Sequence, residues 1–142
     1  MEATVRTARL THLKLVVWNA PWLFFDMKVF RETRCILFFC GTVHCAGGWA
    51  AEDPEFKRQG LRWTGSGKRI VCDEAPKTSS NFDALAAFFG LSDHQSGILF
   101  GRSGSRTVRK WEVVNNIDRL LEGKRLISYH DPQSKDKHFR SQ

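Results

Sequence analysis

Cysteine and histidine residues cluster in one short stretch of the sequence, residues 38–53, which reads FFCGTVHCAGGWAAED. Cys40, His44 and Cys45 lie close together there, and Cys72 follows further along the chain. Thiolate and imidazole are ligands that a tetrahedral zinc ion takes, so these four residues form a candidate metal site. Structural zinc sites usually contain two close ligand pairs, however, and this chain has one cluster and a distant cysteine. Buried apolar thiols are the preferred interpretation.

Cys45 is also the candidate for a reactive thiol, because it is expected in the first turn of a helix, where the helix dipole favours a thiolate. His44 cannot easily serve as its base, since adjacent residues on a helix point about 100° apart. No other part of the sequence offers an Asp, an Asn or an oxyanion loop that would complete a catalytic set. We therefore expect no catalytic residues, no cofactor and no enzyme activity.

A glycine-rich motif, TGSGKR at 64–69, is reminiscent of a phosphate-binding loop. The Walker pattern requires a glycine five residues before Gly67, and Arg62 stands there instead. The flanking segments, 61–64 and 68–72, also look like strands, whereas a Walker loop opens a helix. A hairpin turn is the preferred interpretation.

The segment LAAFFGLSDHQSGILF has the order of a helix-turn-helix motif that reads DNA. Its second helix would begin after Ser92 with Asp93 and His94, and an aspartate at that point repels phosphate. Two core helices joined by a tight turn are therefore preferred. Gly90 would end the first helix in a left-handed conformation, and Ser92 would cap the second.

The best candidate for a binding patch is the basic stretch between Gly101 and Lys110. It contains four cations and no acid, interleaved with serine and glycine: Arg102, Arg106, Arg109 and Lys110. This composition suits contacts with phosphate or with an acidic protein groove, and a solvated loop is the alternative. The net charge of +7 favours an acidic partner of either kind.

Composition favours one domain with its own core, because the chain has 142 residues, of which 42% are hydrophobic, with 11 Phe and 5 Trp. Four polar residues or prolines interrupt the most apolar window, 13–30, so no membrane span is expected: Lys14, Asn19, Pro21 and Asp26. No signal-peptide pattern is visible, and cytosol is the expected compartment. The cysteines are then free thiols or metal ligands and not disulfides.

The elements that position these residues follow from periodicity and capping. We expect a helix over 4–18, a short helical turn within 22–30, a buried strand over 35–39 and a hairpin over 61–72. Further helices are expected from Val43 to about Ala51, between Ser80 and Gly90, after Ser92, and from Trp111 to Gly123 with Val114, Ile117 and Leu121 facing inward. The fold class is a helix-rich α+β single domain over 1–129, with four to five helices, a small hairpin or short antiparallel sheet, and a frayed polar tail over 130–142.

Within this frame, residues 38–53 form mainly a packing joint. Gly41 lets the chain turn, and Thr42 caps the helix that follows. Trp49 would share a buried face with Cys45, and Gly48 would allow another backbone to pack close. Trp49→Ala is accordingly expected to cost about 3–5 kcal/mol as a core truncation.

Four segments, in this order, carry a resemblance to a known group: NAPWLFFDM, CGTVHCAGGWAA, LAAFFGLSDHQSGILF and VVNNIDRLLEGK. Together they resemble small phage and prophage proteins of uncharacterised function with a Cys-Gly-Thr-x-x-Cys-x-x-Gly-Trp segment and a Leu-Gly-Leu-Ser…Leu-Phe helix pair. Phe89 replaces the usual leucine of that pair. The resemblance implies no catalytic residues.

A phage origin implies an accessory protein that acts by binding in the host cytosol. It would inhibit or redirect a host protein or ribonucleoprotein complex, as anti-CRISPR proteins do. Two alternatives remain at this point. One is direct nucleic-acid binding through the basic stretch and the Ser92 helix, and the other is a zinc-stabilised structural module.

Overall fold

The computed structural model describes residues 1–21, 25, 45–64, 69–76, 81–101 and 109–128, and the backbone alone of 32–36 and 39–43. Within this part the chain forms six helices and four short strands. The predicted helix-rich α+β class is confirmed. The predictions for Ser80, for the tail over 130–142 and for most of 22–30 lie outside the described residues.

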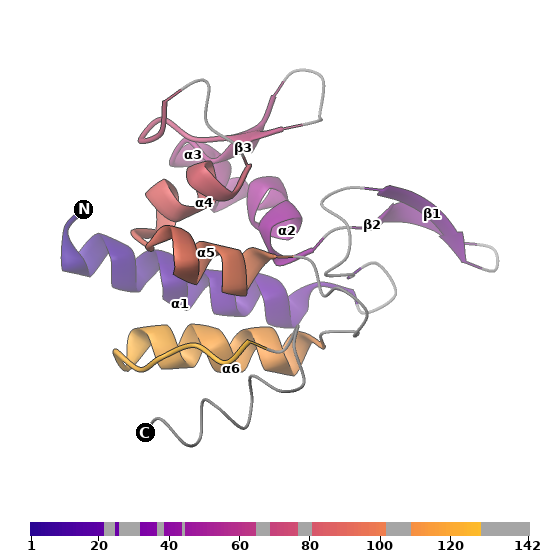
Figure 1. The fold of residues 1–142 in the computed structure, drawn as a ribbon. Coiled ribbons are helices and arrows are strands. Elements are labelled where there is room, and N and C mark those ends of the chain that lie inside the picture. The colour runs from indigo at the N-terminus through magenta and orange to yellow at the C-terminus, as the bar shows by residue number, and fades with distance from the viewer. Residues whose placement is uncertain are drawn as a thin grey trace.

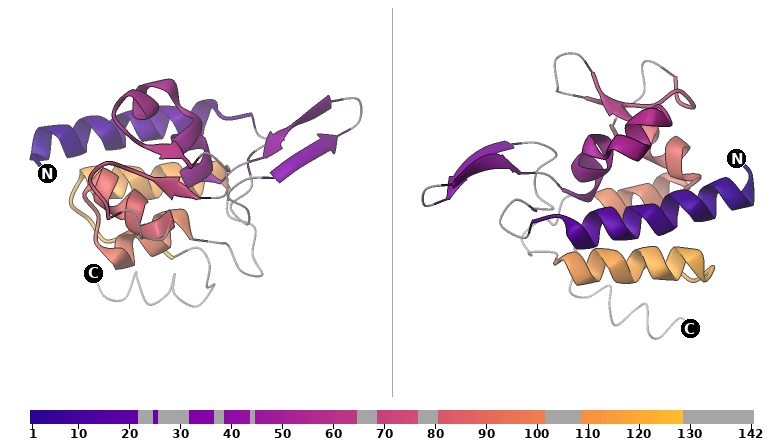
Figure 2. Two further views of the ribbon diagram at one scale, coloured as in Figure 1. Left: turned by 90° about the horizontal axis from the view of Figure 1, so that it is seen from above. Right: turned by 180° about the vertical axis from the view of Figure 1, so that it is seen from behind.

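α1 (Ala3–Asn19) packs against α6 (Lys110–Leu121), α2 (Ala46–Glu52) and α4 (Asn81–Phe89) (Figure 1). α5 (Asp93–Phe100) packs on α4 and also contacts α2 and α6, and α3 (Pro54–Arg58) follows α2 (Figure 2). α1 and α6 run antiparallel, because Lys14 pairs with Asp118 at 2.7 Å and Lys110 contacts the carbonyl of Trp18.

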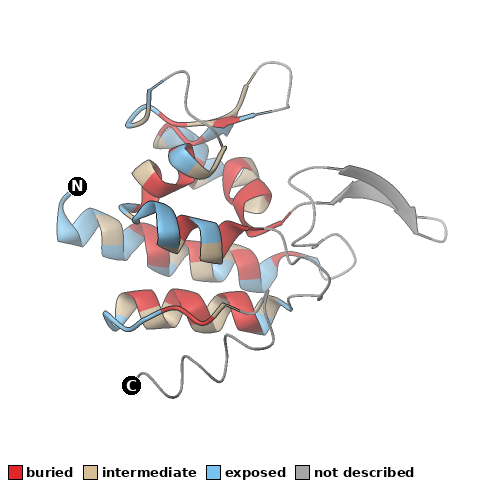
Figure 3. Cartoon of the chain, viewed as in Figure 1, coloured by how far each residue is buried: buried red, intermediate tan, exposed pale blue. Residues whose placement is uncertain are grey.

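An apolar stripe on α1 explains its central place. Leu10, Leu13 and Val17 recur at three and four residues and are fully buried, which confirms the helix that periodicity predicts over 4–18. Figure 3 shows that the buried residues of the molecule gather where α1 meets its neighbours.

Phenylalanine rings fill the core between α3, α4 and α5. Phe88 and Phe89 are adjacent on α4, and each meets Phe56 of α3 edge-on, with ring centroids 5.3 and 5.4 Å apart. Phe89 also lies 5.6 Å from the ring of Phe100 on α5. The edge-to-face packing of Phe56 with Phe88 and Phe89 stabilises the core by more than the buried apolar area alone provides.

Two antiparallel hairpins complete the fold. β3 (Arg62–Trp63) pairs with β4 (Ile70–Val71), and this confirms the hairpin predicted over 61–72. β1 (Glu32–Ile36) pairs with β2 (Phe39–Val43) and projects away from the helices (Figure 1). The segment 35–39, predicted as one strand, therefore contains the end of one strand and the start of the next.

The first hairpin overturns the predicted roles of Gly41 and Thr42. Both lie in β2, where Gly41 is opposite Arg34 and Thr42 is opposite Thr33, so neither turns the chain nor caps a helix. α2 begins only at Ala46, after Cys45 in extended conformation. The β-branched residues Thr42 and Val43 suit a strand better than the start of a helix.

A short helix after α2 was not predicted. α2 ends at Glu52, as the sequence indicates, but Pro54 then occupies the first turn of α3. Proline is well tolerated there because its missing N–H would have no partner within the helix. The carboxylate of Asp53 caps α3 by accepting from the Phe56 amide at 3.1 Å.

The turn between α4 and α5 follows its predicted chemistry. Gly90 has a φ of +64°, and the Leu91 amide donates to the carbonyl of Ala86. Ser92 caps α5 in a capping box with Gln95, whose two hydrogen bonds measure 3.1 and 3.0 Å. Both predicted roles are confirmed.

The inward face of α6 differs from the prediction. Val113, Ile117 and Leu120 are buried, whereas Val114 and Leu121 are only half-buried and Trp111 is 53% exposed. The helix begins at Lys110, and its buried stripe is rotated by about one residue from the predicted one.

Candidate functional site

Three large apolar side chains on α1 and α6 are more than half exposed. Leu15 and Trp18 of α1 are 54% and 59% exposed, and Trp111 of α6 is 53% exposed. We call these three residues the α1 apolar surface. Exposed tryptophan is costly to keep in water, so side chains of this size gathered in one place mark an interaction surface.

The two helices bring these residues to one surface. Leu15 and Trp18 project away from the buried stripe of α1, and Trp18 lies one turn beyond Lys14 on the same side. Trp111 lies two turns before Asp118 on α6. The ion pair of Lys14 with Asp118, at 2.7 Å, and the contact of Lys110 with the Trp18 carbonyl therefore place both tryptophans near the same end of the α1–α6 pair.

Lys110 connects the same two helices. Its ammonium group donates to the carbonyl of Trp18 at 2.9 Å and to that of Ala20, so it satisfies carbonyls that the end of α1 leaves without partners. Partial burial lowers the pKa of Lys110 from its ordinary value of 10.5. This predicted binding residue is therefore engaged in the fold.

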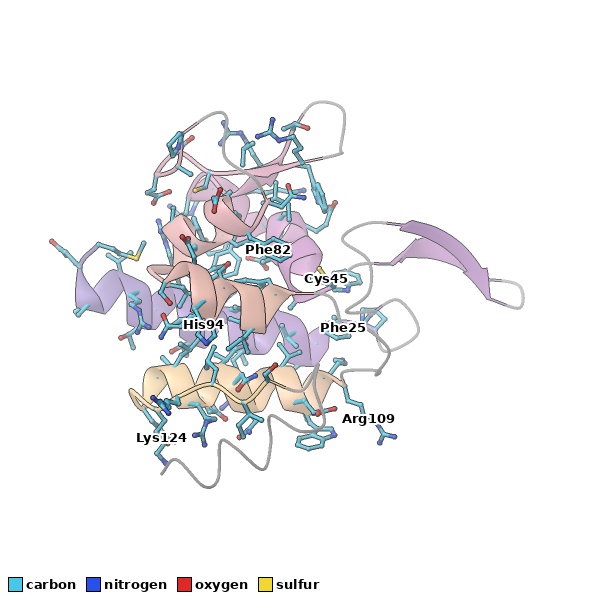
Figure 4. The ribbon with its side chains drawn as sticks, in the orientation of Figure 1. Phe25, Cys45, Phe82, His94, Arg109 and Lys124 are labelled. Carbon is cyan, nitrogen blue, oxygen red and sulfur yellow. The ribbon has the colours of Figure 1, made fainter. Side chains whose placement is uncertain are left out.

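The other residues of the predicted basic patch are placed only in part. Arg109 is exposed and points away from the helices (Figure 4), and its guanidinium makes no hydrogen bond or ion pair with the described residues. Arg102 and Arg106 lie outside the described part of the chain. Arg109 is thus available to bind a partner, whereas its neighbour Lys110 caps the end of α1.

A pocket of about 370 Å³ opens beside the α1 apolar surface. Leu15 belongs to both, and the other residues of its lining come from α1, the residues that follow it, and the junction of α2 with α3: His12, Val16, Asn19, Ala20, Pro21, Trp49, Glu52, Asp53 and Pro54. Trp49 is half-buried in this wall. It is not a core residue, so Trp49→Ala is expected to cost less than the 3–5 kcal/mol of a full core truncation.

A histidine–carboxylate pair lies in the pocket wall. His12 Nε2 is 2.8 Å from Asp53 Oδ2, and the ring of His12 meets Phe56 edge-on at 4.9 Å. Asp53 Oδ2 is also the oxygen that caps α3 through the Phe56 amide. Glu52 at the rim pairs with Lys57 at 3.5 Å. His12 of α1 is thus held by Asp53 and by the Phe56 ring of α3, and Asp53 is held by His12 and by the Phe56 amide.

The three cysteines of the predicted metal site lie in different segments of the described part of the chain. Cys45 is buried at the start of α2 (Figure 4), and Cys40 lies opposite Cys35 in the β1–β2 hairpin. Cys72 is buried, and its thiol donates to the carbonyl of Ala84 at 3.2 Å. His44 lies outside the described residues.

Burial raises the pKa of the Cys72 thiol, which favours the protonated form over the thiolate that a metal takes. No group of three or more His, Cys, Asp or Glu residues among those with described positions could hold a metal ion. Gly48 is buried within α2, as expected for a packing joint.

The second helix of the motif predicted as a possible DNA reader carries no cation. α5 reads DHQSGILF, and its exposed residues include Asp93 and His94, the latter pointing to the outside of the molecule (Figure 4). Asp93 at the start of the helix repels phosphate, and the side chain of Gln95 is engaged in the capping box with Ser92. α4 and α5 pack together as core helices, and residues of both belong to the hydrophobic core.

Sequence reasoning missed the α1 apolar surface and the pairing of His12 with Asp53. A helical wheel of α1 contains the signal for the first, because Leu15 and Trp18 lie off the stripe of Leu10, Leu13 and Val17. The second joins residues 41 positions apart, and no local pattern marks it.

Comparison with protein-family models, with curated proteins and with solved structures finds no match. None of the helices in the described part of the chain is long and apolar enough to cross a membrane.

Proposed function

We propose that the chain is a small protein-binding accessory factor of the phage type that its sequence resembles. In this proposal it acts in the host cytosol, where it inhibits or redirects a host macromolecular complex. The observation that carries the proposal is the α1 apolar surface, in which Leu15, Trp18 and Trp111 are each more than half exposed. Tryptophan is enriched among the few residues that supply most of the binding energy at protein interfaces.

The cations around this surface favour a protein partner over a nucleic acid. Lys14 is paired with Asp118, and Lys110 is engaged with the carbonyls of Trp18 and Ala20. Cations engaged in this way are poorly placed to neutralise phosphates, whereas large apolar side chains gain most from a matching apolar surface. The partner is expected to present an apolar patch, and the net charge of +7 favours one that is acidic overall.

The test compares partner binding by the wild-type chain and by the double variant Trp18→Ser/Trp111→Ser. A stoichiometric partner is first isolated from host lysate on the wild-type chain and identified, and its affinity for each variant is then measured by calorimetry. Truncation of one interface tryptophan costs about 2 kcal/mol or more, so the double variant should bind more than about thirtyfold more weakly.

Val5→Ser is the matched control, because Val5 is an exposed apolar residue of the same helix near its other end. It should bind like the wild type. A double variant that keeps full affinity while both proteins melt alike would overturn the proposed surface.

The inhibitory role needs a separate measurement. Expression of the chain in cells with active CRISPR immunity should raise the plaquing efficiency of a targeted phage, and the double variant should not. Equal plaquing with and without the chain would argue against anti-CRISPR activity but leave the binding surface standing.

A further inference from the structure

We propose that the pocket beside the α1 apolar surface takes one arginine side chain of the partner. This inference rests on the proposed function, because it assumes that the partner is a protein. The pocket shares Leu15 with the α1 apolar surface, so a partner seated on that surface can reach into it. Its volume of about 370 Å³ is near the lower end of the roughly 300–1,000 Å³ that ligand pockets occupy, which suits one side chain.

The walls of the pocket suit the aliphatic part of a long side chain. Val16, Ala20 and Pro21 line it from the end of α1, and Pro54 lines it from the start of α3. Arginine buries its methylene groups along apolar surface of this kind while its charged head reaches a polar partner. Trp49 adds an aromatic wall, on which a guanidinium group can stack.

Asp53, a residue of the pocket lining, has one carboxylate oxygen to offer the charged head. Oδ2 of Asp53 takes part in two hydrogen bonds, one with His12 Nε2 at 2.8 Å and one with the Phe56 amide at 3.1 Å. Asp53 Oδ1 has no hydrogen-bond partner among the residues that the structure describes. The His12 contact and the cap fix the orientation of this carboxylate, so its second oxygen is pre-positioned for a donor.

Charge favours a cation over other occupants. Glu52, which pairs with Lys57, and Asp53, which pairs with His12, both line the pocket, and its described lining contains no Lys or Arg. Arginine fits better than lysine, because its planar guanidinium can stack on an aromatic ring and donate to a carboxylate at the same time. A second copy of the chain is a poor occupant, since two chains of charge +7 repel each other.

The test uses small probes and needs no partner. Nα-acetyl-arginine amide is titrated into the labelled chain, and the indole N–H of Trp49 and the backbone amides near Asp53 are followed by NMR. Nα-acetyl-citrulline amide is the neutral probe of nearly equal shape, and Nα-acetyl-norleucine amide is the apolar one. We expect saturable binding of the arginine probe in the millimolar range, and binding about tenfold weaker for the citrulline probe.

Asp53→Asn should weaken the arginine probe about tenfold as well, because it removes the charge but keeps an oxygen that can cap α3. Glu55→Gln is the matched control, since Glu55 is an acid of α3 outside the pocket that pairs with Arg58. That variant should bind like the wild type, and melting curves confirm that both variants are folded.

Equal affinity for the arginine and citrulline probes, or an unchanged affinity in Asp53→Asn, would overturn the arginine pocket. So would the absence of saturable shifts up to about 50 mM probe. These outcomes do not depend on the partner. They are therefore distinguishable from failure of the Trp18→Ser/Trp111→Ser test, which concerns the α1 apolar surface.

Discussion

Single cations of this chain hold helices together, and Arg9 is the clearest case. It is 8% exposed, and its guanidinium donates to the carbonyl of Phe88 at 2.6 Å and to Gln59 Oε1 at 2.9 Å. It also pairs with Glu74 at 2.9 Å and lies 3.9 Å from the centre of the Phe88 ring. A buried charge is tolerated when its donors are satisfied in this way, so Arg9 links α1 to α4.

A prediction about single residues concerns Lys110 and its neighbour Arg109. Lys110→Met removes the ammonium group that donates to Trp18 and Ala20 at the end of α1, and we expect a loss of about 1 kcal/mol in the free energy of unfolding. The loss is modest because partial burial of the charge, which lowers the pKa of Lys110, already offsets part of the gain.

Urea denaturation measures this loss, with Arg109→Met as the neighbouring control. Arg109 is exposed, and its guanidinium makes no hydrogen bond or ion pair with the described residues, so its variant should stay within about 0.5 kcal/mol of the wild type. Equal destabilisation by the two substitutions would show that Lys110 does not cap α1.

Contacts of single residues were the hardest feature to predict from the sequence. The basic stretch was recognised from its composition, but composition does not distinguish Lys110, which caps a helix 90 residues away, from its exposed neighbour. The pairing of Arg9 with the carbonyl of Phe88 spans 79 residues. Such contacts depend on how helices cross in space, which periodicity does not specify.

At the scale of elements, a buried asparagine fixes the chain after α6. Asn116 donates from its amide nitrogen to the carbonyl of Ile127 and accepts from the Ile127 amide, both at 2.8 Å. Leu126 and Ile127 are buried as a result, and they extend the core beyond the end of α6. Gly123, at a φ of +71°, lets the chain reverse before this contact.

Asn116→Ala is expected to cost about 2–4 kcal/mol, because it leaves a buried N–H and a buried carbonyl of Ile127 without partners. Chemical denaturation measures the loss. Ser92→Ala is the comparison within the same molecule, since it removes one exposed capping bond and should cost about 1 kcal/mol. Similar losses in the two variants would mean that the segment 124–128 contributes little to the core.

Elements themselves were predictable where local chemistry determines them. The stripe on α1, the glycine at 90 and the capping box at Ser92 each depend on residues within one or two helical turns, and each was read correctly. The cap predicted at Thr42 was wrong because threonine is common both as a helix N-cap and within strands. Only the pairing of Thr42 with Thr33 decides between the two. α3 was missed because Pro54 both ends one helix and begins the next.

At the scale of the whole molecule, the positive charge is unevenly distributed along the sequence. Residues with described side chains contain 12 Lys and Arg against 11 Asp and Glu, while the remaining residues contain 10 against 4. The net charge of +7 therefore comes almost entirely from residues other than those with described side chains. In the proposed function, long-range attraction of an acidic partner would therefore come mainly from residues other than those of the α1 apolar surface.

This division predicts different salt responses for the two kinds of partner. Binding to a nucleic-acid duplex would depend on neutralised phosphates, and such binding falls by about 10³–10⁵ between 50 and 200 mM salt when 6–10 phosphates are contacted. Binding through Leu15, Trp18 and Trp111 depends on apolar burial, which salt does not screen. We expect affinity for the protein partner to fall less than about tenfold over that range, chiefly through slower association.

Fluorescence anisotropy with a labelled 20-base-pair duplex completes the comparison. The chain should bind it only weakly at 50 mM salt and, at 200 mM, no more tightly than the roughly 10⁻⁴–10⁻⁶ M of non-specific binding. Submicromolar affinity that persists at 200 mM salt and drops in Arg109→Ser, but not in Trp18→Ser/Trp111→Ser, would favour the nucleic-acid alternative. The reverse pattern, with the protein partner lost in the tryptophan variant and retained in Arg109→Ser, is what the position of the apolar residues on α1 and α6 predicts.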